Sequence, residues 1–203
     1  MSGFYERVVA PRLVNGLYSA KLITEQTQRV VPLAEGVVVE IGIGSGQNLP
    51  LYDAAKVEKV IGIDVNAPVL PLSADRLAAV AFPVEVLRNT MSVRSCIADT
   101  VLITYSLCSI PDPGRALAEV RRILKPSGRL LFCEHGRSIR PGVARWQDRL
   151  NPLWSRIAGG CNINRDVQQM IEAAGFRIDM IARYRAMRPE VLGFHYVGSA
   201  RVG

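Results

Sequence analysis

The sequence has few of the residues that mark metal-stapled, disulfide-bonded or membrane-spanning proteins. Its four cysteines never form a C-x-x-C pair, and only two histidines occur among 203 residues. Secreted domains that need disulfides are shorter and richer in cysteine, so we expect reduced thiols and no metal. No apolar run approaches the roughly 18 residues that a membrane span requires. A chain of this length can bury a core without such staples.

The net charge of +7 comes from scattered arginines rather than from one basic block. A nucleic-acid-binding module is therefore only an alternative interpretation. The first 20 residues carry Glu6, Arg7 and Arg12, where a signal peptide would be apolar. We expect one soluble, cytoplasmic domain over residues 1–203. Its basic N-terminal segment leaves peripheral contact with an anionic membrane open.

Short β-branched runs alternate with helical patterns along most of the chain. Such alternation is typical of an α/β fold with a Rossmann-like, doubly wound sheet, here of seven strands. Strands are expected at 36–41, 60–64, 84–87, 100–105, 129–133, 177–184 and 195–202, and helices at 114–124 and 166–174.

Residues 136–164 form an insertion after the fifth strand that is too long for an ordinary connection, so we expect them to cover the substrate. Trp146 and Trp154 are eight residues apart, which places them near one face of a helix. Core packing is the default interpretation of these tryptophans. The alternative is that they form aromatic walls of an apolar pocket. Residues 1–35 are expected to form an N-terminal helical cap.

A glycine-rich turn, Glu40-Ile41-Gly42-Ile43-Gly44-Ser45-Gly46, directly follows the first strand. Glycines there permit a tight turn and let a ligand approach backbone N–H groups. Asp64 ends the second strand, where a carboxylate can accept hydrogen bonds from ribose hydroxyls. A helix-capping role is its alternative. Gln47 stands where the dinucleotide fingerprint has its third glycine, which argues against an NAD-dependent oxidoreductase.

These residues, in a stretch from about 37 to 131, resemble the class I methyltransferases that use S-adenosylmethionine, of the ubiquinone/menaquinone type. Within this superfamily, the sequence more specifically resembles the thiol S-methyltransferase group. That narrower resemblance rests on Leu107-Cys108-Ser109-Ile110, Phe132-Cys133-Glu134-His135, Trp146-Gln147, Pro152-x-Trp154 and Gly160-Cys161-Asn162.

The resemblance implies S-adenosylmethionine as cofactor and a small-molecule acceptor as partner. Many members have a carboxylate where this chain has Asn89, so adenine recognition here would use an amide or the backbone. Members of the thiol group can carry an N-terminal hydrophobic anchor, which residues 1–35 do not resemble. The implied contacts are Glu40, Gly42, Gly44, Ser45 and Gly46 around the methionine part, Asp64 at the ribose, Val65, Arg88 and Asn89 at the adenine, Thr104, Tyr105, Ser106 and Leu107 beside the sulfonium, and Tyr5 and Tyr18 over the acceptor.

The expected reaction is methyl transfer to a small apolar acceptor, with a thiol preferred. A thiol of pKa about 8.5 is roughly a tenth ionised at pH 7.5, so positioning alone can suffice. The alternatives are N-methylation of a phospholipid amine and C- or O-methylation of a quinone-like ring. An amine or a carbon acid needs a general base.

Four further residues have candidate roles. His135 lies just past the fifth strand and is the candidate base or orienting group, with a structural histidine as its alternative. His195 is expected to be structural. Cys161 has no cysteine or histidine at ligand spacing, which favours a small packing residue. Glu134 is expected to pair with Arg137 or Arg165.

Overall fold

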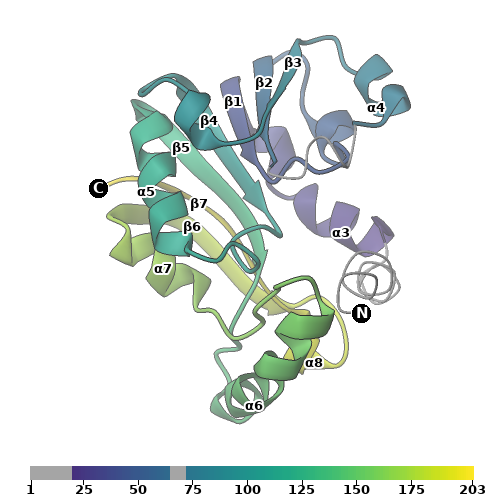
Figure 1. The fold of residues 1–203 in the computed structure, drawn as a ribbon, viewed down its shortest axis with the longest axis vertical. Helices are drawn as coiled ribbons and strands as arrows, with labels where there is room; N and C mark the ends of the chain where they lie inside the picture. Colours follow the sequence, from purple (N-terminus) through teal and green to yellow (C-terminus); the bar gives the residue numbers. More distant parts are fainter. Residues whose placement is uncertain (1–19, 65–71) are drawn as a thin grey trace.

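The β-branched runs of the sequence form the strands of one sheet (Figure 1). The computed structural model describes residues 20–64 and 72–203. In the first strand, Val38 packs in one buried cluster, while Val39 and Ile41 pack in another. Both faces of the sheet are therefore covered, which explains the nearly continuous apolar runs. The strands are β1 (Gly36–Ile41), β2 (Val57–Ile63), β3 (Val84–Leu87), β4 (Ala98–Thr104), β5 (Leu124–His135), β6 (Phe176–Arg185) and β7 (Phe194–Val202).

The strands follow the order β3-β2-β1-β4-β5-β7-β6. The first five are parallel, and β7 runs antiparallel to both β5 and β6. The expected seven-stranded, doubly wound sheet is thus confirmed. Its strand order reverses between β1 and β4, and ligands bind at such switch points beyond the carboxyl ends of the strands.

Helix α5 illustrates how the sequence positions a helix on this sheet. Asp112 accepts a hydrogen bond from the backbone N–H of Arg115 at 2.9 Å and caps the helix. Leu117, Val120 and Ile123 then form the buried face. The helices are α3 (Ala20–Thr27), α4 (Ala74–Ala78), α5 (Pro113–Ile123), α6 (Pro141–Ile157), α7 (Val167–Ala173) and α8 (Glu190–Gly193), with 3₁₀ turns η2 (Val31–Leu33), η3 (Leu49–Leu51) and η4 (Thr90–Ser92).

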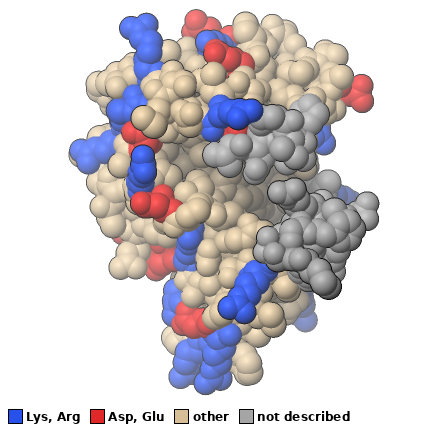
Figure 2. All heavy atoms as spheres, in the orientation of Figure 1, with Lys and Arg blue, Asp and Glu red and all other residues tan. Residues whose placement is uncertain are grey.

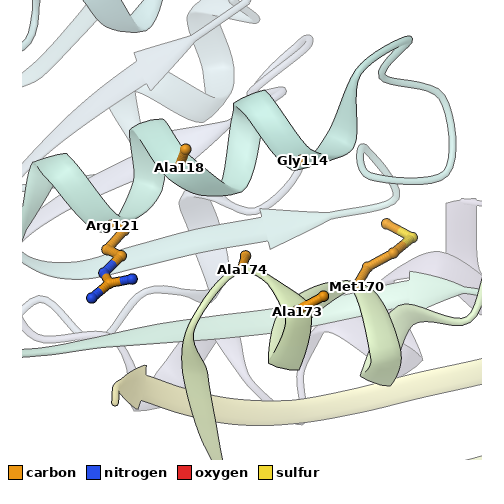
Figure 3. Close-up of a pocket in the computed structure, with 6 residues that line it drawn as sticks. All are labelled: Gly114, Ala118, Arg121, Met170, Ala173 and Ala174. Atoms are coloured by element: carbon orange, nitrogen blue, oxygen red, sulfur yellow. The ribbon is translucent and has the colours of Figure 1, made fainter.

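Helices α5 and α7 lie side by side on one face of the sheet (Figure 1). A cavity of about 460 Å³ lies between them, and Figure 3 shows its small side chains around Met170 and Arg121. Its lining residues come from α5, α7 and the end of α7, and not from the turn after β1. The side chain of Arg121 is its single charged group, so we interpret the cavity as a gap between two helices.

The insertion forms helix α6, which lies with α8 at one end of the molecule, beyond the carboxyl end of β5 (Figure 1). On the face seen in Figure 2, basic side chains are spread among acidic ones and no single basic patch covers it. Within the described part of the chain, no helix is both long and apolar enough to cross a bilayer.

Candidate active site

A cleft of about 200 Å³ opens where the sheet reverses its strand order. One wall is the turn that follows β1, and the other is the segment that follows β4. Both come from the carboxyl edge of the sheet, which brings together residues some 60 positions apart in the chain. The cleft is lined by Ile23, Glu40, Gly42, Ile43, Gly44, Ser45, Gln47, Asn48, Thr104, Tyr105 and Ser106.

The glycine turn and the carboxylate after β2 meet directly. The backbone N–H of Gly44 donates to Oδ2 of Asp64 at 2.9 Å. Gly42 has a φ of +80°, and a Cβ there would overlap the hydroxyl of Ser106 on the opposite wall. A glycine is required at that position for both reasons. Ser45 is held from outside by Arg76, whose guanidinium donates to its hydroxyl at 2.7 Å.

Glu40 is buried at the base of the cleft. Its two carboxylate oxygens accept hydrogen bonds from Asn48 at 2.8 Å and from the Tyr52 hydroxyl at 2.7 Å. Burial raises its pKa to about 7, although both hydrogen bonds act in the opposite direction. The Asn48 amide also donates to Thr104 at 2.9 Å and so joins the ends of β1 and β4. Sequence reasoning missed Asn48 and Tyr52, because their pairing with Glu40 depends on the turn that follows it.

The segment after β4 is held by a carboxylate from β5. Glu134 accepts hydrogen bonds from the backbone N–H groups of Ser106 (2.7 Å), Leu107 (2.9 Å) and Cys108 (3.3 Å). Burial raises the pKa of Glu134 to about 7. The expected pairing of Glu134 with an arginine is wrong, because these three donors engage the carboxylate.

The two arginines expected to pair with Glu134 have other partners. Arg137 pairs with Asp148 of α6 at 2.6 Å, which lowers the pKa of Asp148 to about 2. Arg165 donates to the carbonyl oxygens of Leu107 and Ile110, the latter at 2.8 Å. Arg165 therefore stabilises the same loop as Glu134, but through backbone carbonyls.

His135 lies behind the cleft rather than in its wall. Its side chain is 5% exposed, and its ring centroid lies 4.7 Å from that of Tyr105, which does line the cleft. Burial lowers the pKa of His135, and the neighbouring His195 lowers it further. His195 itself is fully buried, with Nδ1 2.9 Å from the carbonyl oxygen of Gly193. The role of His135 as a base stays a prediction.

Cys108 and Cys161 lie together beside His135, far apart though they are in the chain. The interaction between the two thiols raises the pKa of Cys108 and lowers that of Cys161. Trp154 packs in the same buried cluster, and its indole also lowers the pKa of Cys161. The spacing in sequence contained no signal for this arrangement.

The other predicted residues lie outside the cleft wall or outside the described residues. Trp146 is 57% exposed and Trp154 only 7%, so the two tryptophans do not form a common wall. Two residues that are eight positions apart on a helix point in directions that differ by about 80°. Pro152 also lies inside the helix between the two tryptophans. Arg88 and Asn89 are exposed just after β3, next to the end of β2. Tyr5, Tyr18 and Val65 lie outside the described residues.

The chain is similar in sequence to known proteins. A family model described as a methyltransferase domain matches residues 39–132. Thiol S-methyltransferase TMT1B of Rattus norvegicus is 32% identical over 149 residues, which cover 70% of this chain and 60% of that protein. Over these residues the chain is similar to methyltransferases. The human thiol S-methyltransferase TMT1A is 29% identical to this chain, over 77% of the chain and 69% of its own length.

Solved structures show the same fold. A methyltransferase of Thermotoga maritima dependent on S-adenosylmethionine superposes with a TM-score of 0.64 at 21% identity, over the whole of both chains. The chain thus spans about 60 to 70% of the length of these two sequence relatives and superposes on the whole of that solved chain.

S-adenosylmethionine, the cofactor expected from the sequence, is also the cofactor named for solved structures of this fold, and the cleft fits it. The backbone of Gly44 lines the cleft, and no atom of the described residues lies within 4 Å of a Cβ placed there. The buried carboxylate of Glu40 lies at the base of the cleft, and the carboxylate of Asp64 lies beside the glycine turn. These two carboxylates suit an ammonium group and a ribose, respectively.

Proposed function

We propose that this methyltransferase transfers a methyl group from S-adenosylmethionine to the sulfur of a small, apolar thiol. The proposal depends on the hydrogen bonds of Glu40, the carboxylate that lines the cleft. Among the described lining residues, Glu40 is the only carboxylate, and both of its oxygens are engaged by Asn48 and Tyr52. An acceptor that ionises without an enzyme base therefore fits best, and a thiol is such an acceptor. Similarity to two thiol S-methyltransferases supports the same choice.

The protein's part in this reaction is to bind and orient. When bound, the cofactor supplies a methyl group on a sulfonium with a good leaving group. The glycine turn, Glu40 and Asp64 would hold the cofactor, and Tyr105 and Ile23 present apolar surface to the same cleft. Orientation and exclusion of water can supply about 7 to 11 kcal/mol of the barrier, so no nucleophilic residue is required. The cytoplasmic location and the covering role of the insertion remain predictions.

The test is an acceptor screen with methyl-labelled cofactor. Phenylmethanethiol should become labelled at sulfur, and benzyl alcohol, the matched control with oxygen in place of sulfur, should not. Phosphatidylethanolamine vesicles and a reduced quinone represent the two alternative acceptors. Label that enters the lipid amine or the ring, while the thiols stay unlabelled, contradicts the proposal.

A further inference from the structure

Cys108, His135 and Cys161 form a compact group of three metal-ligating side chains. One ligating atom from each lies within 4.8 Å of the others, and all three residues are buried. Sγ of Cys161 lies 3.9 Å from Nδ1 of His135. We propose that these three residues bind one Zn²⁺ ion, with a fourth coordination position that takes the sulfur of the thiol acceptor. The second half of this proposal rests on the proposed function.

The distances are close to those of a zinc site. Zn–S bonds of about 2.3 Å and Zn–N bonds of about 2.0 Å in a tetrahedron place the ligand atoms roughly 3.5 to 3.8 Å apart. The observed separations therefore require side-chain shifts of at most about 1 Å. Two thiolates balance the charge of the ion, so the filled site is neutral in its apolar surroundings of Trp154, Ala158 and Ile163.

The surrounding hydrogen bonds hold the two cysteine loops against each other. Asn162 donates from its backbone N–H and from its amide to the carbonyl oxygen of Cys108, at 2.8 and 3.0 Å. Its amide also donates to Gly160 at 2.7 Å. Asn151 of α6 donates to the Asn162 side-chain oxygen at 2.9 Å. Supporting interactions of this kind orient ligands in metal sites and are worth one to two orders of magnitude in affinity, about 10- to 100-fold.

The ligand set selects the metal and leaves a position open. Two sulfurs and one imidazole nitrogen suit Zn²⁺ and exclude Mg²⁺ and Ca²⁺, which prefer oxygen ligands. Three protein ligands are the number found in catalytic zinc sites, whereas structural sites use four. Within the described residues, no fourth cysteine, histidine or carboxylate joins the group.

The group adjoins the cofactor cleft. Tyr105 lines the cleft and contacts the His135 ring, and Ile23 lines the cleft and packs against the cluster that contains both cysteines. A thiol that binds at the open position would exchange its proton, released to solvent, for a sulfur–zinc bond. Binding to the metal would thus ionise the sulfur of the acceptor, which Glu40 cannot do because both of its oxygens are engaged.

The three ligands also come from the motifs of the narrower resemblance. Cys108 belongs to Leu107-Cys108-Ser109-Ile110, His135 ends Phe132-Cys133-Glu134-His135, and Cys161 is the centre of Gly160-Cys161-Asn162. A disulfide between the two cysteines would use only two of these residues. The metal site accounts for all three.

The first experiment measures metal binding by the full chain. We expect one Zn²⁺ per chain by elemental analysis, and visible absorption bands typical of sulfur-ligated Co²⁺ after replacement. Cys161→Ser and His135→Gln should weaken zinc binding by about 100-fold or more. Cys161→His, which keeps a ligand, should restore part of it. Cys133→Ala, a buried cysteine outside the group, and the exposed Cys96→Ser are the matched controls.

Binding of S-adenosylhomocysteine by each variant shows that it has folded. Equal zinc binding by Cys161→Ser and the parent overturns the site, as does a Cys108–Cys161 disulfide that remains after treatment with a reductant and Zn²⁺. Absence of bound Zn²⁺ in a chain that still binds S-adenosylhomocysteine has the same meaning.

The second experiment tests the open position. Phenylmethanethiol should shift the Co²⁺ bands in a saturable way, and benzyl alcohol should leave them unchanged. Unchanged bands with the thiol overturn its coordination to the metal. This readout needs no turnover, so it separates failure of the metal proposal from failure of thiol methylation, which the acceptor screen measures.

Discussion

Single residues at the carboxyl edge of the sheet set the chemistry of the cleft. Gly42, Gly44 and Asp64 were identified from the order of the motif alone, and the hydrogen bond from Gly44 to Asp64 places them together. The surroundings of Glu40 were not identified, because Asn48 and Tyr52 reach it only through the turn and η3. The presence of polar residues after a motif does not predict hydrogen bonds to a residue within it.

Asp64 is expected to contribute much of the affinity for the cofactor. Asp64→Ala removes a carboxylate that can accept two ribose hydrogen bonds, so S-adenosylhomocysteine should bind about 10- to 1,000-fold more weakly by calorimetry. Asp53→Ala, which changes a partly exposed aspartate outside the cleft lining, is the control. Unchanged affinity in Asp64→Ala would show that the ribose lies elsewhere.

Glu40 should make stability depend on pH. Its pKa is raised from 4.5 to about 7 in the folded state, so its contribution to stability is complete below pH 4.5 and is lost as the pH rises through 7. Relative to Glu40→Gln, the parent should lose up to about 3 kcal/mol between pH 4 and pH 8. Urea unfolding of both proteins measures this difference. A constant difference between them would contradict the assigned pKa.

At the scale of elements, periodicity located the strands and helices well, and contacts between elements set their ends. The expected strand 84–87 matches β3, while β5 extends to 124–135 because its first residue pairs with Ala98 of β4. Helix α6 has an inner and an outer side that the spacing of two tryptophans did not reveal. Trp146 lies on the exposed side, where Arg149 stacks over its ring.

Gln147 holds α6 against the rest of the molecule. Its side chain accepts from the Ser138 N–H at 2.8 Å and donates to the carbonyls of Gly136 and Val191 at 3.1 and 3.2 Å. Gln147→Ala leaves these buried groups unpaired, so it should lower the free energy of unfolding by about 2 to 4 kcal/mol. Hydrogen exchange should then be faster in α6. The exposed Gln169→Ala is the control, and equal stability of the two variants would contradict this role.

At the scale of the whole molecule, the seven strands between residues 36 and 202 form one sheet. We therefore expect a single cooperative unfolding transition for residues 1–203, with equal calorimetric and van't Hoff enthalpies. S-adenosylhomocysteine at 100 times its Kd should stabilise the protein by about 2.7 kcal/mol and raise Tm by roughly 5 to 10 °C. Two separate transitions, or a shift in only one of them, would contradict the single domain.

The sequence by itself determined the alternation of strands and helices, the doubly wound sheet and the position of the cofactor turn, because these depend on periodicity and on glycines over short stretches. Only the tertiary structure decided what lies across the cleft. Glu134 reaches the loop after β4, and Cys108, His135 and Cys161 converge from three separate segments. Such contacts arise from packing between distant segments, so the spacing of residues along the chain does not predict them.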